Sequence, residues 1–434
     1  MRVKKVELKD YKRFKHLCIE LPEEAKLIVL TGPNGCGKSS IFEAFNTRSR
    51  SSISRQDGLI YEQDSEYHLN TRKDVSTHQH YPLNENIIIE LYDALDKSVP
   101  TNISTPEFII RSAYRCSADF QVSQFGGNDH AFDAGAPQRL IDIDARVEDN
   151  YKKILSASIN DLFSPENNDV SAKTIKDKII GTIRDAVSKI FPDLILSDLG
   201  ANPMSQGTFR FTKGVTADFH YKNLSGGEKA VFDLLLDFII KSKSAPNTIF
   251  CIDEPELHMH NKIQAKFLEV LFAQIPNNGQ LWITTHSVGI IRKAVDLWKE
   301  NKQQVIFIDL HDKDLDNSLT VTPVTPSQNF WKIVFDTNLG DLANLMLPKQ
   351  IILCEGDPKN DSKKTKENKE FDAEIYNKIF SNSYPDTKFI SLGSQSEVKN
   401  KGLLAAWLLK SLASEVKIIR FIDRDDHNDE EIAK

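Results

Sequence analysis

The segment that most constrains the fold of this chain is Thr31-Gly-Pro-Asn-Gly-Cys-Gly-Lys-Ser39, which fits GxxxxGK[ST] directly after the apolar run Ala25–Leu30. A strand that feeds a glycine loop and then opens a helix turns successive backbone N–H groups toward one point. That geometry is typical of a cradle for a di- or triphosphate. We therefore predict that the chain binds a nucleotide, because the strand and helix context argues against a chance glycine-rich turn.

The loop also assigns roles to its residues. Lys38 is expected to reach the outer phosphates, and the Ser39 hydroxyl to ligate Mg²⁺. Glycines permit backbone angles and a close approach that side chains would block. The residues predicted at the nucleotide are Gly32, Asn34, Gly35, Cys36, Gly37, Lys38, Ser39 and Ser40.

Length and composition limit the class of protein. At 434 residues, two or three domains are expected. No apolar run is long enough to span a bilayer, the start does not resemble a signal peptide, and five cysteines without metal-type spacing fit a reducing cytoplasm. The net charge of −7 argues against an overall clamp on nucleic acid, but it does not exclude local basic patches. Residues 4–15 form either such a patch or a solvated face, and for residues 359–369, which also contain many acidic and Asn residues, a solvated loop is favoured.

A second motif, Leu224-Ser-Gly-Gly-Glu228, precedes the apolar segment Ala230–Ile240. Ser225 and Glu228 have the spacing of a capping box, and the glycines allow the turn to approach another surface closely. Taken alone, this pattern also fits a well-capped buried helix.

Two further apolar strands end in polar residues. Asn247–Glu256 ends in Asp253, which suits a Mg²⁺ contact opposite Ser39, and in Glu254, which suits the base that orients and deprotonates an attacking water. Gln280–Ser287 ends in His286, which is able to touch the same phosphate.

Four such elements in this order resemble an ABC-type ATPase, and Tyr11-Lys-Arg-Phe14 before the first apolar strand is similar to the N-terminal segment of its SMC/RecF-like branch. The resemblance implies a homodimer, or a higher assembly, that holds ATP between protomers, with Arg13 at the nucleotide. It also implies that the signature turn of one protomer completes the site of the other. The residues concerned are Ser225, Gly226, Gly227 and Glu228.

Two features fit the family less directly. Its Q-loop glutamine is not placed by the sequence: Gln121 and Gln124 follow the strand pair Asn86–Tyr92 and Glu107–Tyr114, but each of them also fits a plain loop residue. His258 and His260 form an H-x-H that suggests metal binding, but they fall where the D-loop of the family runs. A dimer-contact or structural role is therefore favoured.

We expect residues 1–345 to form the ATPase domain, a mixed sheet with a helical subdomain. Residues 47–81 are polar and predict an insertion, and helical apolar spacing places the helical subdomain at about 135–200. A hairpin around Gly214 is expected to lead into the signature turn.

The pattern restarts in residues 346–434. Strands at Gln350–Cys354, Lys388–Leu392 and Val416–Ile422 alternate with helices at Phe371–Ile379 and Leu403–Leu412. This order predicts a parallel sheet with its active groups at the carboxyl ends of the strands. Glu355, Asp423 and Asp425 would emerge there, and clustered carboxylates select Mg²⁺ or Mn²⁺.

The E-G…D-x-D arrangement resembles a Toprim domain, in which Glu355 is catalytic and ligates metal with Asp423 and Asp425. Asp372 is the best match for a further acidic residue, with Asp357 second. The chain ends nine residues after Asp425, where Toprim sheets usually continue, so we expect a truncated or degraded, Toprim-like parallel α/β domain.

An ABC-type ATPase followed by Toprim resembles the OLD (overcoming lysogenisation defect) family of nucleases. This resemblance implies ATP-controlled cutting or nicking of DNA in bacterial defence against phage. One alternative is a non-cleaving sensor that holds a partner protein or nucleic acid, such as a partner nuclease or a retron. Another is a RecF-like repair ATPase that binds DNA ends without cutting.

Overall fold

The computed structural model divides the chain into two compact units, Met1–Val324 and Thr325–Lys434, which are described separately. The described residues are 1–53, 86–92, 107–115, 119–120, 122, 139–163, 170–200, 202–327, 330–331, 334, 350–355, 371–380, 383–384, 387–392, 398 and 417–421. The division falls before the boundary at 345 that the sequence predicts. None of the described helices is both long and apolar enough to cross a membrane.

The first unit is built on a parallel sheet. Its strand order is β11-β3-β10-β9-β5, and every neighbouring pair is parallel. The strands are β3 (Leu27–Thr31), β5 (Phe108–Arg111), β9 (Ile249–Asp253), β10 (Gln280–Thr284) and β11 (Val305–Asp309), and each is buried along its whole length. Burial on both faces explains why these segments read as continuous apolar runs.

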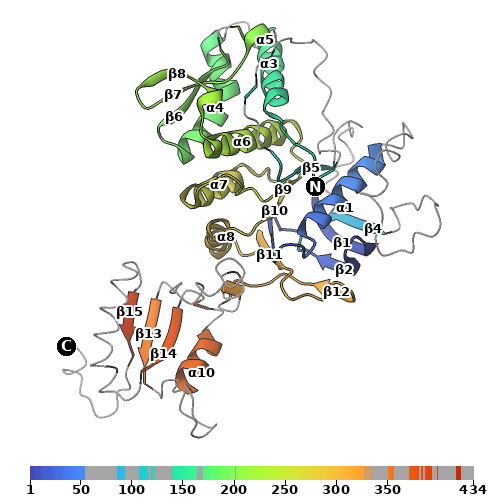
Figure 1. The fold of residues 1–434 in the computed structure, drawn as a ribbon, viewed down its shortest axis with the longest axis vertical. Coiled ribbons are helices and arrows are strands. Elements are labelled where there is room, and N and C mark those ends of the chain that lie inside the picture. Colours follow the sequence, from blue (N-terminus) through green and yellow to red (C-terminus); the bar gives the residue numbers. More distant parts are fainter. Residues whose placement is uncertain are drawn as a thin grey trace. The chain divides into compact units, whose positions relative to one another are not determined.

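Helices cover both faces of this sheet (Figure 1). One side carries α1 (Lys38–Ile53), and the other carries α6 (Gly226–Ser244), α7 (Asn261–Gln274) and α8 (Val288–Glu300). Because α1 runs to Ile53, the predicted insertion at residue 47 begins within a helix. Residues 54–81 of that insertion lie outside the described part of the chain.

A second sheet lies beyond α1 and has the order β12-β2-β1-β4. Its strands are β1 (Arg2–Tyr11), β2 (Phe14–Glu20), β4 (Ile87–Tyr92) and β12 (Ser318–Val321). The predicted pairing of the strands at Asn86–Tyr92 and Glu107–Tyr114 is wrong. β4 pairs with β1 and β5 pairs with β9, so the two belong to different sheets.

The lysines of the N-terminal basic run are paired with acids. Lys5 and Lys9 both contact Glu7. Their hydrogen bonds lower the pKa of Glu7 to about 2, although burial acts to raise it. The remaining pairs are Lys4–Glu90, Lys12–Glu43 and Lys15–Asp10. This run is therefore a charge-balanced face and gives no support to a DNA-binding patch.

The helical subdomain joins helices to a small antiparallel sheet. Two of its helices, α3 (Val147–Phe163) and α4 (Ala172–Ile190), lie where the apolar spacing predicts helix. The short α5 (Pro203–Gln206) was not predicted. The sheet is β6 (Leu194–Asp198), β7 (Arg210–Lys213) and β8 (Thr216–His220). The hairpin β7–β8 is confirmed and leads through the 3₁₀ turn η3 (Tyr221–Asn223) into α6.

Asp237 of α6 ties this subdomain to the parallel sheet. Arg111 of β5 donates to its carboxylate from Nε at 2.5 Å and from Nη2 at 3.0 Å. Asn150 of α3 donates at 2.9 Å, and Lys241 Nζ lies 2.8 Å away. The three charged side chains are at most 5% exposed, so each ion needs the others to offset its lost hydration.

The second unit contains a parallel sheet in the order β14-β13-β15, as the restarted pattern predicts. Its strands are β13 (Gln350–Cys354), β14 (Thr387–Ser391) and β15 (Lys417–Arg420), and α10 (Phe371–Phe380) packs on β14. Ile351, Leu353 and Val398 form its described core. The predicted helix at Leu403–Leu412 lies outside the described residues, and the Toprim assignment stays a prediction.

We predict that Asp237→Ala lowers the free energy of unfolding of the first unit by about 3 kcal/mol or more, because it removes the acidic partner of buried Lys241 and the nearer of two acidic partners of buried Arg111. Urea denaturation measures the loss. Asp177→Ala is the matched control, since Asp177 is 45% exposed and pairs with Arg184 at the surface. It should cost less than about 1 kcal/mol. Equal losses in the two variants would contradict the role given to Asp237.

Candidate functional site

The phosphate loop, residues 32–37, lies between β3 and α1. Gly37 has φ of 93°, and an added Cβ would lie 2.4 Å from Cζ of the buried Phe14 ring. Arg13 donates from Nη1 to the carbonyl of Gly35. The N-terminal segment at Tyr11–Phe14 thus packs directly on the loop, which is a contact that the sequence pattern alone does not give.

Lys38 is buried, and its ammonium lies over the loop. Nζ donates to the carbonyls of Gly32 at 2.8 Å and Pro33 at 3.1 Å, and it lies 2.8 Å from His286 Nε2. Burial lowers the pKa of Lys38. Burial, followed by the charge of Lys38, lowers the pKa of His286 to about 4. His286 is therefore neutral near pH 7, and its Nε2 accepts the Lys38 hydrogen bond.

A hydroxyl and a carboxylate meet beside Lys38. Ser39 Oγ donates to Asp253 Oδ2 at 2.9 Å, and Thr284 Oγ1 donates to Asp253 Oδ1. Oxygen atoms of this kind are the ligands that Mg²⁺ prefers. Ser39 and Asp253 are thus adjacent, as the sequence predicts, and this donor set fits the cation that accompanies a nucleotide triphosphate.

Glu254 stands next to this pair in a strained conformation. Its φ is 43°, and its N–H donates to Thr284 Oγ1 at 3.0 Å. Its Oε1 lies 3.7 Å from His286 Nε2. Burial, and then the neighbouring charge of Asp253, raises the pKa of Glu254 above its ordinary value, which suits a general base.

Glu256 is a site residue that the motif reading missed. Its Oε1 accepts from Thr285 Oγ1 at 2.7 Å, from the N–H of His286 at 2.8 Å and from the N–H of Ser287 at 3.0 Å. The carboxylate therefore fixes the turn that presents His286. The third acidic residue of Asp253-Glu-Pro-Glu256 was the available signal, but nothing in the sequence showed which segment it would bind.

The signature turn is capped as predicted. Ser225 Oγ accepts from the N–H of Glu228 at 3.3 Å, and Glu228 Oε2 accepts from the N–H of Ser225 at 2.8 Å. Glu228 also lies 2.7 Å from Lys213 Nζ. A Cβ on Gly226 would meet open space. The role of Ser225–Glu228 at the nucleotide of another protomer stays a prediction.

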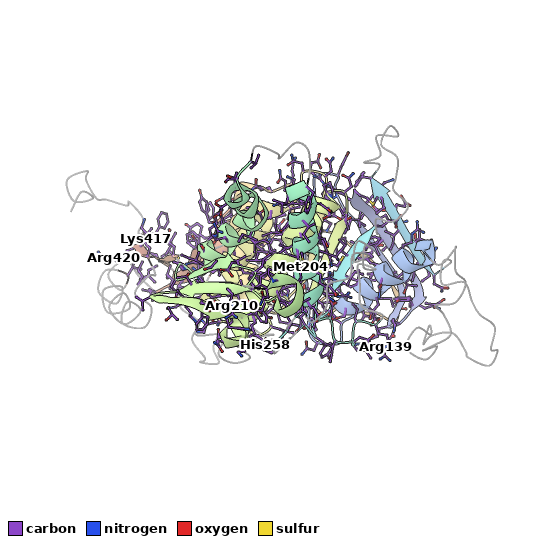
Figure 2. All side chains as sticks on the ribbon, turned by 90° about the horizontal axis from the view of Figure 1, so that it is seen from above. Arg139, Met204, Arg210, His258, Lys417 and Arg420 are labelled. Atoms are coloured by element: carbon purple, nitrogen blue, oxygen red, sulfur yellow. The ribbon has the colours of Figure 1, made fainter. Side chains whose placement is uncertain are left out.

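Of the H-x-H pair, His260 serves local structure. His260 is the N-cap of α7, where its Nδ1 accepts from the N–H of Lys262. His258 is exposed at the edge of the molecule in Figure 2, and its carbonyl lies 3.0 Å from where a Cβ on Gly227 would be. Within the described residues no group of three or more His, Cys, Asp or Glu side chains is placed to hold a metal.

Other predicted residues fall partly outside the described chain. Gln121, Gln124, Asp357, Asp423 and Asp425 lie outside it, and so does the side chain of Asp372. Glu355 is described and follows β13 directly. The predicted carboxylate cluster of the second unit therefore stays a prediction.

Comparison with known proteins supports the ATPase reading. The sequence profile of the family RecF/RecN/SMC N-terminal domain matches residues 2–308. A comparison with curated protein sequences finds no match.

Solved structures of SMC heads are similar to the chain at low identity. An SMC head bound to the C-winged helix domain of ScpA has a TM-score of 0.41 and 14% identity, and covers 75% of this chain and 97% of its own. The SMC head domain from Thermotoga maritima has a TM-score of 0.36 and 15% identity, with coverages of 75% and 99%. An SMC head from Pyrococcus furiosus has a TM-score of 0.37 and 13% identity, with coverages of 74% and 96%.

We predict that Gly37→Ala weakens ATP binding about tenfold or more. The new methyl group must displace the Phe14 ring, and the alanine must adopt a positive φ. Titration with a fluorescent ATP analogue measures the affinity. Gly181→Ala is the control, because Gly181 lies within α4 and a Cβ there meets nothing within 4 Å. An unchanged affinity in Gly37→Ala would show that the loop does not need this close approach.

Proposed function

Because the chain belongs to the RecF/RecN/SMC N-terminal domain family, we propose that it is an ABC-type ATPase that hydrolyses ATP between two copies of itself. The observation that carries this proposal is the convergence of Ser39, Asp253 and Glu254 around Thr284. Ser39 lies at the start of α1, Asp253 and Glu254 at the end of β9, and Thr284 at the end of β10, so three different segments of the chain meet here. That arrangement is suited to ATP and Mg²⁺.

Each side chain has a step to perform. Lys38 leaves the carbonyls of Gly32 and Pro33 to bind the outer phosphates, which are stronger acceptors. Glu254 takes a proton from the attacking water. His286, which is neutral and held by Glu256, donates or accepts a hydrogen bond at the phosphate that is lost. A Mg²⁺ ion held by Ser39 and Asp253 would neutralise charge that develops on the phosphate oxygens.

The signature turn supports the dimeric form of the proposal. Capping by Ser225 and Glu228 fixes the first turn of α6, and Gly226 leaves its N–H end open. A helix N-terminus of this kind favours an anion. A phosphate held by the loop of one protomer fits the signature turn of a second.

We predict that Glu254→Gln slows ATP turnover at least about a hundredfold, because an amide cannot accept the proton from water. ATP binding should persist, and the ATP-bound dimer should accumulate. Steady-state phosphate release and sedimentation velocity measure the two effects. Turnover equal to that of the wild type would remove Glu254 from the role of base.

For the second unit we propose a metal-dependent DNA endonuclease or nickase that ATP controls. Two facts support it: β13 and β15 are parallel neighbours, and Glu355 follows β13 directly, while Asp423 follows β15 in sequence. Carboxyl ends of adjacent parallel strands share one edge of a sheet. Similarity to OLD nucleases extends this proposal to bacterial defence against phage, with DNA as a partner.

We predict that plasmid DNA is nicked in the presence of Mg²⁺ or Mn²⁺ and that ATP changes the rate. Glu355→Ala and Asp423→Ala should each abolish nicking, because the metal loses a ligand. Both should keep the ATPase rate of the wild type. Gel electrophoresis of supercoiled plasmid measures the nicking.

If the wild-type protein hydrolyses ATP but never nicks, the cleaving role is refuted. The ATPase would then serve as a sensor that holds a partner nuclease or a retron nucleic acid, or as a RecF-like repair ATPase. Binding to DNA ends without cleavage would favour the repair role.

A further inference from the structure

Two consecutive carbonyl groups at the end of β9 point at one guanidinium. Arg115 Nη1 lies 2.6 Å from the carbonyl oxygen of Asp253, and Nη2 lies 2.8 Å from that of Glu254. Nη1 also contacts the carbonyl of Ser112. The planar fork of a guanidinium matches a pair of acceptors, whereas an ammonium does not. Arg115 therefore holds the main chain on which Glu254 stands.

The turn that Arg115 holds needs such support. Glu254 has φ of 43°, a region that residues other than glycine rarely occupy unless their surroundings impose it. Thr284 accepts from the N–H of Glu254 at 3.0 Å, and Arg115 binds its carbonyl. The peptide groups on both sides of the residue are thus fixed by side chains from other segments.

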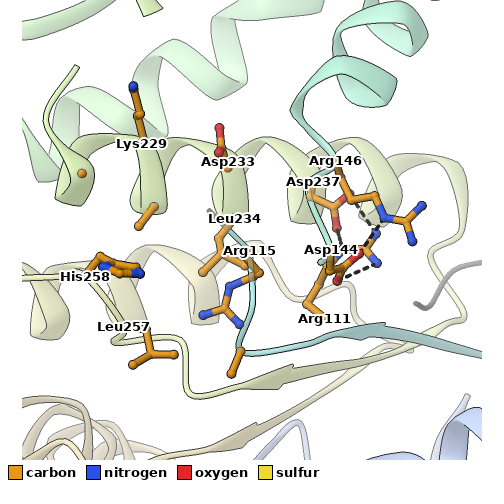
Figure 3. Close-up of a pocket in the computed structure, with 13 residues that line it drawn as sticks. Arg111, Arg115, Asp144, Arg146, Lys229, Asp233, Leu234, Asp237, Leu257 and His258 are labelled. Atoms are coloured by element: carbon orange, nitrogen blue, oxygen red, sulfur yellow. Dashed lines mark hydrogen bonds and ion pairs between the residues drawn. The ribbon is translucent and has the colours of Figure 1, made fainter. Parts of the chain in front are cut away.

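The segment that carries Arg115 also reaches the signature helix. Arg111, at its start, donates twice to Asp237 of α6. The N–H of Ser112 donates to Asp144 at 3.2 Å. Figure 3 shows Arg111 beside Asp237 on one side of the pocket and Arg115 nearer its centre. Residues 111–115 therefore join α6 to the turn after β9.

Arg115 also borders a cavity. A cavity of about 320 Å³ is lined by Gly226, Ala230 and Leu234 of α6 and by Arg115, Leu257 and His258 (Figure 3). Arg115 thus binds the turn after β9 beside an open space that the first turns of α6 also line.

We propose that Arg115 is a positioning residue of the ATPase, which fixes the main chain of Glu254 and makes that geometry depend on α6 through Arg111 and Asp237. This inference rests on the proposed function, since Glu254 is the base in that proposal. Arg115 acts through the carbonyls of Asp253 and Glu254, so its removal should change the rate of the chemical step and leave nucleotide affinity alone.

The test compares Arg115→Ala with Arg115→Lys. Arg115→Ala should lower kcat about tenfold to a hundredfold, since a small misplacement of the base is enough for such a loss. The KM for ATP should stay within about twofold, because the affinity of the ground state is not touched. Arg115→Lys should recover only part of the rate, since one ammonium cannot match both carbonyls.

Chemical rescue separates positioning from a general loss of structure. Guanidinium ions at concentrations far below denaturation should restore part of the kcat of Arg115→Ala, because the adjoining cavity admits them. They should not restore Glu254→Gln. Arg184→Ala is the matched control: Arg184 Nε also donates to a main-chain carbonyl, that of Leu196 at 2.9 Å, but in the helical subdomain. Its kcat should equal that of the wild type.

Hydrogen exchange of the peptide over residues 253–257 completes the test without turnover. Arg115→Ala should exchange faster there than the wild type, and Arg184→Ala should not. If Glu254→Gln stops hydrolysis while Arg115→Ala keeps the kcat and exchange of the wild type, the inference is overturned and the proposed function stands. If the wild type shows no hydrolysis, the proposed function fails, and unchanged exchange in Arg115→Ala would still overturn the positioning role.

Discussion

The parallel pairing of β9 with β10 places Thr284 opposite Asp253, and the candidate site depends on that register. The Thr284 hydroxyl donates to the Asp253 carboxylate and accepts from the N–H of Glu254. A slip of one residue would turn Thr284 to the other face of the sheet and separate it from both. Because β3 pairs with β10 in the same direction, the phosphate loop opens at the same edge.

The sequence predicted what depends on short stretches of chain. Apolar runs marked the buried strands, the glycine loop marked the start of α1, and Ser225 with Glu228 marked the start of α6. It could not predict contacts between distant segments. Glu256 binds the turn at His286, about thirty residues further along the chain. Arg115 binds the carbonyl of Glu254, and nothing about an arginine in the sequence indicates that partner. The strand at Asn86–Tyr92 likewise gave no sign that its partner is β1 and not β5.

Burial shifts the pKa of three side chains in the candidate site, those of Lys38, Glu254 and His286. Lys38 and neutral His286 share a hydrogen bond, and Glu254 lies within reach of His286 while burial favours its protonated form more than in water. A bound polyphosphate would take over the Lys38 ammonium and leave His286 free to turn toward it. The ion pair of Arg111 with Asp237 lies deeper in the fold and links this region to the helical subdomain. Arg111, which forms this ion pair, and Arg115, which is proposed to position Glu254, therefore lie on one short segment, residues 111–115.

Complementation between two inactive variants tests the shared ATP site most directly. Lys38→Ala removes the phosphate contact, and Ser225→Arg blocks the signature turn, so each variant alone should be inactive. A mixed dimer contains one intact site, made from the loop of one variant and the turn of the other. We predict that mixing restores ATP hydrolysis that neither variant shows alone. Full activity of Ser225→Arg by itself, or a mixture as inactive as its components, would contradict a site built from two protomers.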